Sequence, residues 1–184
     1  MALLPSAEKR LSPVELDELD LRDKDFVTGK TEEGIAEYLK SALGPWQTIS
    51  SKLESAEKGS PFLLIICASA QRAVDLIREL APLQEKTKVA KLFAKHFKIE
   101  AQVLYLASHM CNIAVGTPNR IFHLIQKDGL KVNCLKYFII DWTWQDKKQR
   151  TIAKIPELMQ DLAVLLSSHI LPLTKQNQVQ IGLY

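Results

Sequence analysis

Residues 62–80, FLLIICASAQRAVDLIREL, decide the fold. The first part, residues 62–68, is an uninterrupted apolar run, which is typical of a short strand covered on both faces. The second part begins at Ser69, whose side-chain oxygen suits a helix N-cap, and it ends before Ala81 and Pro82. This stretch therefore predicts one buried strand followed directly by one helix.

The same alternation of strand and helix continues to the end of the chain. Strands that alternate with helices pair in parallel through right-handed crossovers, which predicts a three-layer α/β sandwich with a mostly parallel sheet of about five strands. Further strands are predicted at 88–94, 111–117, 135–141 and 179–184, and further helices at 97–108, 118–129 and 149–170.

The first third of the chain has a different character. We expect residues 1–59 to form an acidic, partly helical segment and linker, and residues 60–184 to form the α/β domain. Ser12, with a proline after it, suits the start of a short helix, and residues 35–43 have helical spacing. Residues 50–60, SSKLESAEKGS, are predicted to be an exposed linker.

The composition indicates an intracellular globular protein. Hydrophobic residues make up 47% and charged residues 24% of 184 residues, and we expect no membrane-spanning segment and no secretory signal. Cys67, Cys111 and Cys134 are an odd number beside apolar residues, which favours reduced core thiols, and their spacing does not suit zinc. We expect the protein to be a monomer on its own and to carry no metal ion or cofactor.

The charge is distributed unevenly. Residues 1–37 carry five basic and ten acidic side chains, a balance of −5, and the remainder carries 19 basic and 11 acidic ones, a balance of +8. A basic excess attracts polyanions such as RNA, although the charge alone favours a soluble lysine-rich surface as its explanation.

Two loops at predicted carboxyl ends of strands are suited to phosphate binding. In GTPNR, residues 116–120, Gly116 allows a tight turn, Thr117 offers a hydroxyl, and Arg120 adds a charged donor beside the first turn of a helix. In CASAQR, residues 67–72, Ser69 and Arg72 repeat the arrangement. Side by side, the loops predict a shallow track for the phosphates of one strand, with an ordinary capped helix as the alternative for each.

A third loop, TGKTEEG at residues 28–34, has only the tail of a phosphate loop. Lys24 stands where the first glycine belongs, and the preceding DLRDKDF is not the expected hydrophobic strand. Without a glycine arch, backbone N–H groups do not wrap a triphosphate. The sequence therefore predicts a fold without a functional phosphate loop.

Asp141 follows the predicted strand at 135–141, at a position where nucleotide hydrolases hold magnesium. One carboxylate is too little charge for this task without nucleotide phosphates, and no neighbouring Glu is present to orient an attacking water. Trp142 and Trp144 follow instead, and they suit packing or stacking on a base or a partner side chain. Asp141 is therefore interpreted as the remnant of a nucleotide site.

The loops at residues 67–72, 116–120 and 141–146 together resemble the first RecA-like domain of DEAD-box RNA helicases over about residues 60–145. LIICASAQRAVDLIREL stands in the place of A-P-T-R-E-L, IAVGTPNRI in that of T-P-G-R with Asn119 for the glycine, and YFIIDWTWQD in that of D-E-A-D. In those helicases the first two loops hold the RNA backbone. The resemblance implies RNA contacts at Ser69, Thr117 and Arg120, while Ala70 replaces the first motif's Arg. With Arg72 and Asn119 from the same two loops, the candidate RNA contacts are Ser69, Arg72, Thr117, Asn119 and Arg120.

A second resemblance covers nearly the whole chain. SPFLLIICASAQRAVDLIREL, VAKLFAKHFKIEAQV, VGTPNRI and FIIDWTWQDKK resemble the eukaryotic Cms-type proteins linked to the small ribosomal subunit. This resemblance implies a nuclear, nucleolar factor in early small-subunit biogenesis, built on a degenerate helicase domain that is a pseudoenzyme.

Three functional hypotheses follow. The first is a non-catalytic assembly factor that binds pre-rRNA. The second is a protein-interaction scaffold among pre-ribosomal proteins without RNA contact, with either Trp142 and Trp144 or the acidic N-terminal segment as the contact surface. The third, an ATPase that uses residues 28–31 and Asp141, requires turnover that Lys30→Ala abolishes, and the missing motifs speak against it.

Overall fold

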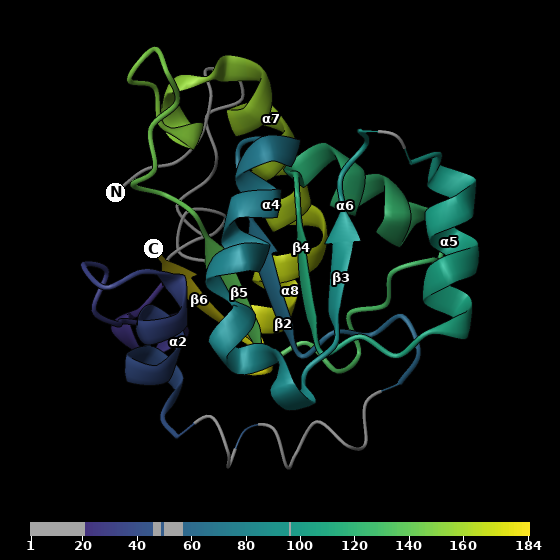
Figure 1. Cartoon of the computed structure of the whole chain (residues 1–184), viewed down its shortest axis with the longest axis horizontal. Helices are drawn as coiled ribbons and strands as arrows, with labels where there is room; N and C mark the ends of the chain where they lie inside the picture. The colour runs from purple at the N-terminus through teal and green to yellow at the C-terminus, as the bar shows by residue number, and fades with distance from the viewer. Residues whose placement is uncertain (1–20, 46–48, 50–56, 96) are drawn as a thin grey trace.

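The computed structural model describes residues 21–45, 49, 57–95 and 97–184. Within this part, six parallel strands form one sheet with helices on both faces, which confirms the predicted three-layer α/β sandwich (Figure 1). The sheet order is β1-β6-β5-β2-β4-β3. The strands are β1 Phe26–Val27, β2 Leu63–Ile66, β3 Val89–Leu92, β4 Ile113–Gly116, β5 Tyr137–Ile140 and β6 Gln180–Leu183.

The helices follow the predicted alternation, with one subdivision. The segment predicted as one helix at 149–170 consists of a 3₁₀ turn, an α-helix and a π-helical turn that leads into another short helix. The α-helices are α2 Ile35–Leu43, α4 Ala70–Glu79, α5 Ile99–Ser108, α6 Pro118–Gln126, α7 Pro156–Leu165 and α8 Leu171–Lys175; the 3₁₀ turns are Asp23–Asp25, Ala81–Lys86 and Ile152–Lys154, and the π turn is Leu166–Ile170. The helix predicted at Ser12 and most of the predicted linker lie outside the described residues.

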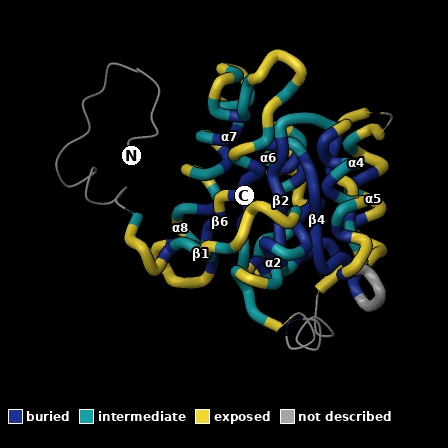
Figure 2. Tube along the Cα trace, turned by 60° about the vertical axis from the view of Figure 1, so that its left-hand side comes forward, coloured by how far each residue is buried: buried dark blue, intermediate teal, exposed yellow. Residues whose placement is uncertain are grey.

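Alternate residues of each strand point to opposite faces, and this alternation builds two cores. On one face Leu64 and Phe138 pack with side chains of α5 to α8, and on the other Ile65 and Ile139 pack with α2 and α4. Figure 2 shows the central strands as buried, with the exposed residues concentrated in loops and outer helix faces. A sheet covered on both faces explains why its strands are apolar without alternation.

The sheet extends into the segment before residue 60. Phe26 pairs with Ile181, which places β1 at the edge of the sheet beside β6, and α2 contributes Ile35, Tyr38 and Leu39 to the second core. Lys24 also donates a hydrogen bond from Nζ to Asn177 Oδ1 at 2.7 Å. Residues 21–45 are therefore attached to the α/β domain, while the division at residue 59 stays a prediction.

Candidate functional site at the carboxyl edge of the sheet

All six strands end at one edge of the sheet, and the predicted site residues lie in the loops that follow. Asp141 follows β5, Ser69 lies after β2, and Thr117 follows β4. Because β2 lies between β5 and β4, the Ser69 loop lies between the other two. The edge divides into two groups, which we call the clamp (Arg72, Glu79, Asp141 and Trp144) and the track (Ser69, Thr117, Asn119 and Arg120).

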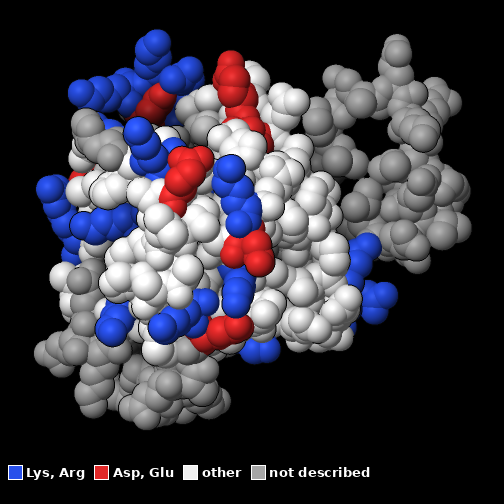
Figure 3. Space-filling model, turned by 90° about the vertical axis from the view of Figure 1, so that its right-hand side faces the viewer, with Lys and Arg blue, Asp and Glu red and all other residues white. Residues whose placement is uncertain are grey.

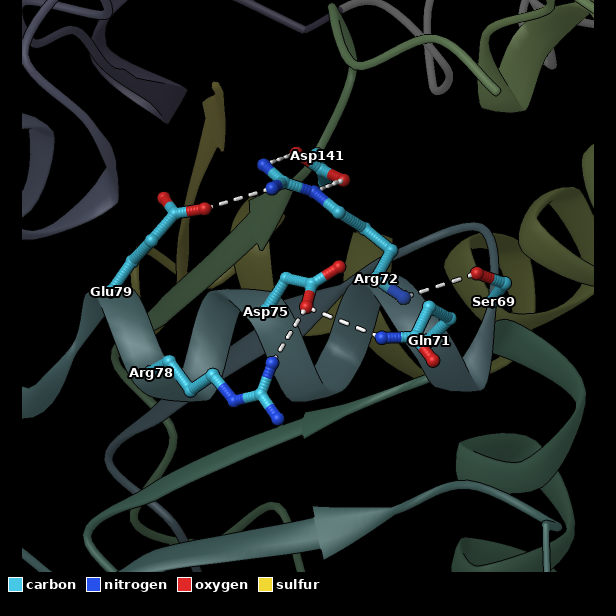
Figure 4. A network of polar contacts seen from close by, with 7 residues as sticks. All are labelled: Ser69, Gln71, Arg72, Asp75, Arg78, Glu79 and Asp141. Carbon is cyan, nitrogen blue, oxygen red and sulfur yellow. Dashed lines mark hydrogen bonds and ion pairs between the residues drawn. The ribbon is translucent and has the colours of Figure 1, made fainter. Parts of the chain in front are cut away.

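The clamp is a buried ion pair with two additional contacts. Arg72 donates to both carboxylate oxygens of Asp141, from Nε at 2.9 Å and from Nη2 at 3.0 Å (Figure 4). Its Nη1 donates to Glu79 Oε1 at 2.9 Å. The side chain of Arg72 is 9% exposed and that of Asp141 is 0% exposed. The Trp144 ring lies over the guanidinium, with 5.6 Å from Cζ to the ring centre.

Burial and pairing act against each other on these charges. Burial lowers the pKa of Arg72, but the hydrogen bonds and charges of Asp141 and Glu79 outweigh it and hold that pKa above its ordinary value. Burial raises the pKa of Asp141, and the hydrogen bonds from Arg72 oppose the rise. The adjacent Cys67 thiol is also buried, which raises its pKa to about 12. Separating the pair would leave a charge in the interior without a partner.

Helix geometry brings the clamp together from distant parts of the sequence. Ser69 caps α4, and its Oγ accepts the Arg72 N–H at 3.2 Å. Seven residues make about two helical turns, so Glu79 lies on the same side of α4 as Arg72. Asp141 follows Ile140, which is paired with Ile66 of β2. The seven-residue spacing of Arg72 and Glu79 is the signal in the sequence that indicates this pairing, and it is not part of the phosphate-loop pattern.

The loop at residues 28–34 lies after β1, so the prediction that no strand precedes it is wrong. The Lys30 N–H donates to Ser41 Oγ at 2.9 Å, and a Cβ on Gly29 would lie 2.5 Å from the Tyr38 carbonyl oxygen. The loop is thus packed closely against α2. At the N-terminus of α2, a Cβ on Gly34 would lie 3.8 Å from Glu79 Oε2, so that carboxylate is near the helix start.

The track residues lie on neighbouring loops. The Cys67 N–H donates to the Gly116 carbonyl at 2.9 Å, which joins the loops after β2 and β4. Thr117 is half-buried at the N-cap position of α6, without a side-chain capping bond. Exposed Asn119 donates to Asp161 Oδ1 at 3.3 Å, and half-buried Arg120 donates to Gln102 Oε1 at 3.3 Å.

Of the five candidate RNA contacts, Arg72 is placed differently from the other four. Its guanidinium is buried against two carboxylates, so in this conformation it does not face a ligand at the edge. The expectation that Arg72 is a phosphate donor therefore does not fit its contacts. Ser69, Thr117, Asn119 and Arg120 remain the candidate RNA contacts.

The two tryptophans have intramolecular contacts. The Trp142 side chain is half-buried against the first core, and the backbone N–H of Trp142 donates to the Tyr184 carbonyl at 2.7 Å. Trp144 covers the Arg72 guanidinium. Their contact with a partner protein stays a proposal.

The residues at the edge do not fit the metal ion that the fold implies. Both oxygens of Asp141 accept hydrogen bonds from a guanidinium, which has only N–H donors and does not bind a cation. Among the described residues, no group of three or more His, Cys, Asp or Glu side chains is arranged to hold a metal ion.

None of the described helices is long and apolar enough to cross a membrane.

Comparison with solved structures shows the class of fold. The crystal structure of a DEAD box protein from Methanococcus jannaschii superposes with a TM-score of 0.52 at 21% identity, over 75% of this chain and 35% of that one. The fold is therefore that of a DEAD-box RecA-like domain.

The sequence comparisons show the family. The family described as "CMS1: U3-containing 90S pre-ribosomal complex subunit" matches residues 3–184, and the chain belongs to this family. Homo sapiens Protein CMSS1 is 38% identical over 172 residues, which cover 93% of this chain and 61% of that protein. Chaetomium thermophilum Protein CMS1 is 40% identical over 166 residues, 85% of this chain and 64% of that protein. The chain spans about three fifths of the length of the curated relatives it matches.

Proposed function

We propose that the chain is a non-catalytic RNA-binding and assembly factor that acts on pre-rRNA in small ribosomal subunit biogenesis, within the nucleolus. The family description, a subunit of a U3-containing 90S pre-ribosomal complex, supports the setting. The observation that carries the RNA contact is the hydrogen-bonded pair of loops after β2 and β4, which puts Ser69 and Thr117 on neighbouring loops of one edge.

The track is suited to a sugar-phosphate backbone. A hydroxyl at Thr117 and the first turn of α6 offer hydrogen bonds and a positive helix end, both of which favour phosphate oxygens. The bonds of Asn119 and Arg120 to other side chains are long, at 3.3 Å, and a charged phosphate would compete for these donors. A ligand can therefore bind here without opening the core.

The surrounding surface adds a modest electrostatic attraction. Figure 3 shows Lys and Arg side chains at several places on the α5 side of the molecule, interspersed with Asp and Glu. Lys91, Lys95, Lys98 and Lys127 are exposed on β3, the following loop and the ends of α5 and α6. Attraction of this kind is independent of sequence and weakens as salt rises.

The absence of catalysis is supported by the clamp. A nucleotide hydrolase needs its strand-end Asp to hold the magnesium that bridges the phosphates. Here that carboxylate is paired with Arg72, and the backbone N–H of Lys30 is bonded to Ser41. We therefore propose a pseudoenzyme that binds no nucleotide.

The experiment is a titration of fluorescent single-stranded RNA, at two salt concentrations and with or without Mg²⁺-ATP. We expect salt-sensitive binding that ignores ATP. Thr117→Ala/Arg120→Ala should weaken binding about tenfold and reduce the slope of log affinity against log salt by about 0.7, the value for one phosphate contact to a single strand. Arg78→Ala is the control, because it removes the same charge from the exposed side of α4.

Two outcomes would overturn the proposal. If the wild-type protein binds no RNA, the scaffold hypothesis is favoured instead. Trp144→Ala is then expected to weaken binding to pre-ribosomal proteins. Turnover of Mg²⁺-ATP that Lys30→Ala abolishes would show an enzyme instead.

A further inference from the structure

The clamp has the charge pattern of a nucleotide site, but every charge in it belongs to the chain. In phosphate-loop enzymes, an Asp at the end of a strand holds Mg²⁺, and phosphate oxygens complete the coordination of the ion. Asp141 is at such a position, and a positive group contacts it, but that group is the Arg72 guanidinium. The same guanidinium contacts a second carboxylate, Glu79, as a metal ion would contact a phosphate.

Glu79 is placed where an anion is favoured. Helix N-termini bind phosphates because their free N–H groups and dipole are positive. The N-terminus of α2, which follows the loop at 28–34, has the Glu79 carboxylate nearby at Gly34. On its own helix Glu79 is in the last turn of α4, where the dipole disfavours a negative charge. Its location is therefore explained by Arg72 and α2, and not by α4.

We propose that Arg72 is a built-in cation that takes the place of a divalent metal ion at Asp141, with Glu79 in the place of a phosphate. The clamp then joins α4 to the loop after β5 without a nucleotide, and Glu79 lies beside the start of α2. This inference goes beyond the proposed RNA contact and does not depend on it.

The geometry favours arginine over other cations at this position. Its planar fork matches both oxygens of Asp141 while a third nitrogen reaches Glu79, which an ammonium group does not reproduce. The Trp144 ring lies over the guanidinium, with 5.6 Å from Cζ to the ring centre, and adds a cation–π contact. A hydrated Mg²⁺ at this position would need both carboxylates as ligands, and it would need the space that the guanidinium fills. The ion and the guanidinium therefore exclude each other.

The proposal predicts that removing Arg72 creates a metal site. In Arg72→Ala, two carboxylates that contacted one guanidinium are left together with no cation, and a divalent ion supplies the missing charge. An ion that binds only the folded state raises its stability in proportion to the logarithm of its concentration. The variant should therefore melt well below the wild type and recover part of the loss in millimolar Mg²⁺ or Ca²⁺.

The measurement is the melting temperature of the full 184-residue chain over a Mg²⁺ titration, together with the luminescence of bound Tb³⁺ sensitised by Trp144. We expect no response from wild type, and a rise in both signals for Arg72→Ala that Arg72→Ala/Asp141→Asn lacks. Arg78→Ala, on the exposed side of the same helix and paired with Asp75, should behave as wild type.

Two results would overturn the inference. One is wild-type Tb³⁺ luminescence that Asp141→Asn removes, because Asp141 would then bind metal with Arg72 present. The other is a folded Arg72→Ala that does not respond to any divalent ion. Should Arg72→Ala fail to fold, Arg72→Gln keeps a donor for Asp141 and frees the second carboxylate, and it is judged by the same two signals.

Discussion

The clamp and the track lie at the same edge of one sheet, yet they use their polar groups differently. In the clamp, a guanidinium and two carboxylates satisfy one another at 2.9–3.0 Å, with Arg72 and Asp141 buried and Glu79 partly exposed. In the track, Asn119 and Arg120 make single bonds of 3.3 Å near the surface. In the clamp, the charged groups of the chain pair with one another and leave no group for a ligand. In the track, the donors are weakly bonded, and a ligand can compete for them.

The largest expected effect is at Gly116, the last residue of the strand that leads into the track. A Cβ on Gly116 would lie 2.0 Å from the Leu92 carbonyl oxygen, so a side chain requires the backbones of β3 and β4 to separate. Gly116→Val should lower the free energy of unfolding by about 5 kcal/mol or more, because the clash is with backbone atoms. Urea denaturation measures it, with exposed Ala101→Val as a control that costs less than about 1 kcal/mol. Equal midpoints for both variants would contradict the close approach.

The next effect compares a buried with an exposed ion pair. Asp141→Ala leaves the buried Arg72 without its main partner, and should lower stability by about 3–5 kcal/mol. Asp75→Ala removes the partner of Arg78, whose side chain is 74% exposed, and should cost less than about 1 kcal/mol. Thermal or urea unfolding of the two variants measures the difference, and similar losses would show that the clamp is not a stabilising contact in solution.

The thiols report on the same region with a smaller effect. Burial raises the pKa of Cys67 and of Cys111 to about 12, so at pH 8 only about one in ten thousand of these thiols is ionised. Cys134 is half-buried, and we expect a thiol reagent to label it first. Asp141→Ala should accelerate the labelling of Cys67 but not of Cys111. Mass spectrometry of labelled peptides identifies the order, and rapid labelling of Cys67 in wild type would contradict a closed clamp.

The smallest effect concerns an ion pair on the surface of the loop that follows the clamp. Hydrogen bonds from the Arg150 side chain and backbone lower the pKa of Asp146 from its ordinary value of 3.8. A carboxyl group with a lowered pKa stabilises the fold above the unfolded pKa, and this contribution is lost as the pH falls through the folded value. Arg150→Ala should move the pKa of Asp146 upward, which NMR titration of the carboxyl carbon detects. An unchanged pKa would show that the pair does not persist in water.

Much of the fold follows from local patterns in the sequence. The apolar runs at β2, β4 and β5 and the capping residue Ser69 predict strands and helices because their signals lie within one element. The two-residue strand β1 has no such signal, since Phe26 and Val27 are stabilised in the sheet by pairing with β6, more than 150 residues later. The subdivision of the segment at 149–170 also depends on packing and is not visible in its apolar pattern.

The candidate site also has some features that neighbouring residues determine and others that depend on tertiary packing. The sequence by itself determined the alternating α/β order, the GTPNR loop and the isolated Asp141, because each is a property of neighbouring residues. Only the tertiary structure decided what Arg72 does, because its partner Asp141 lies 69 positions away and burial determines whether a charge faces solvent or another charge. An arginine beside a loop suited to phosphate binding predicts a hydrogen-bond donor to phosphate. In the folded protein, Arg72 is instead the counter-ion of Asp141.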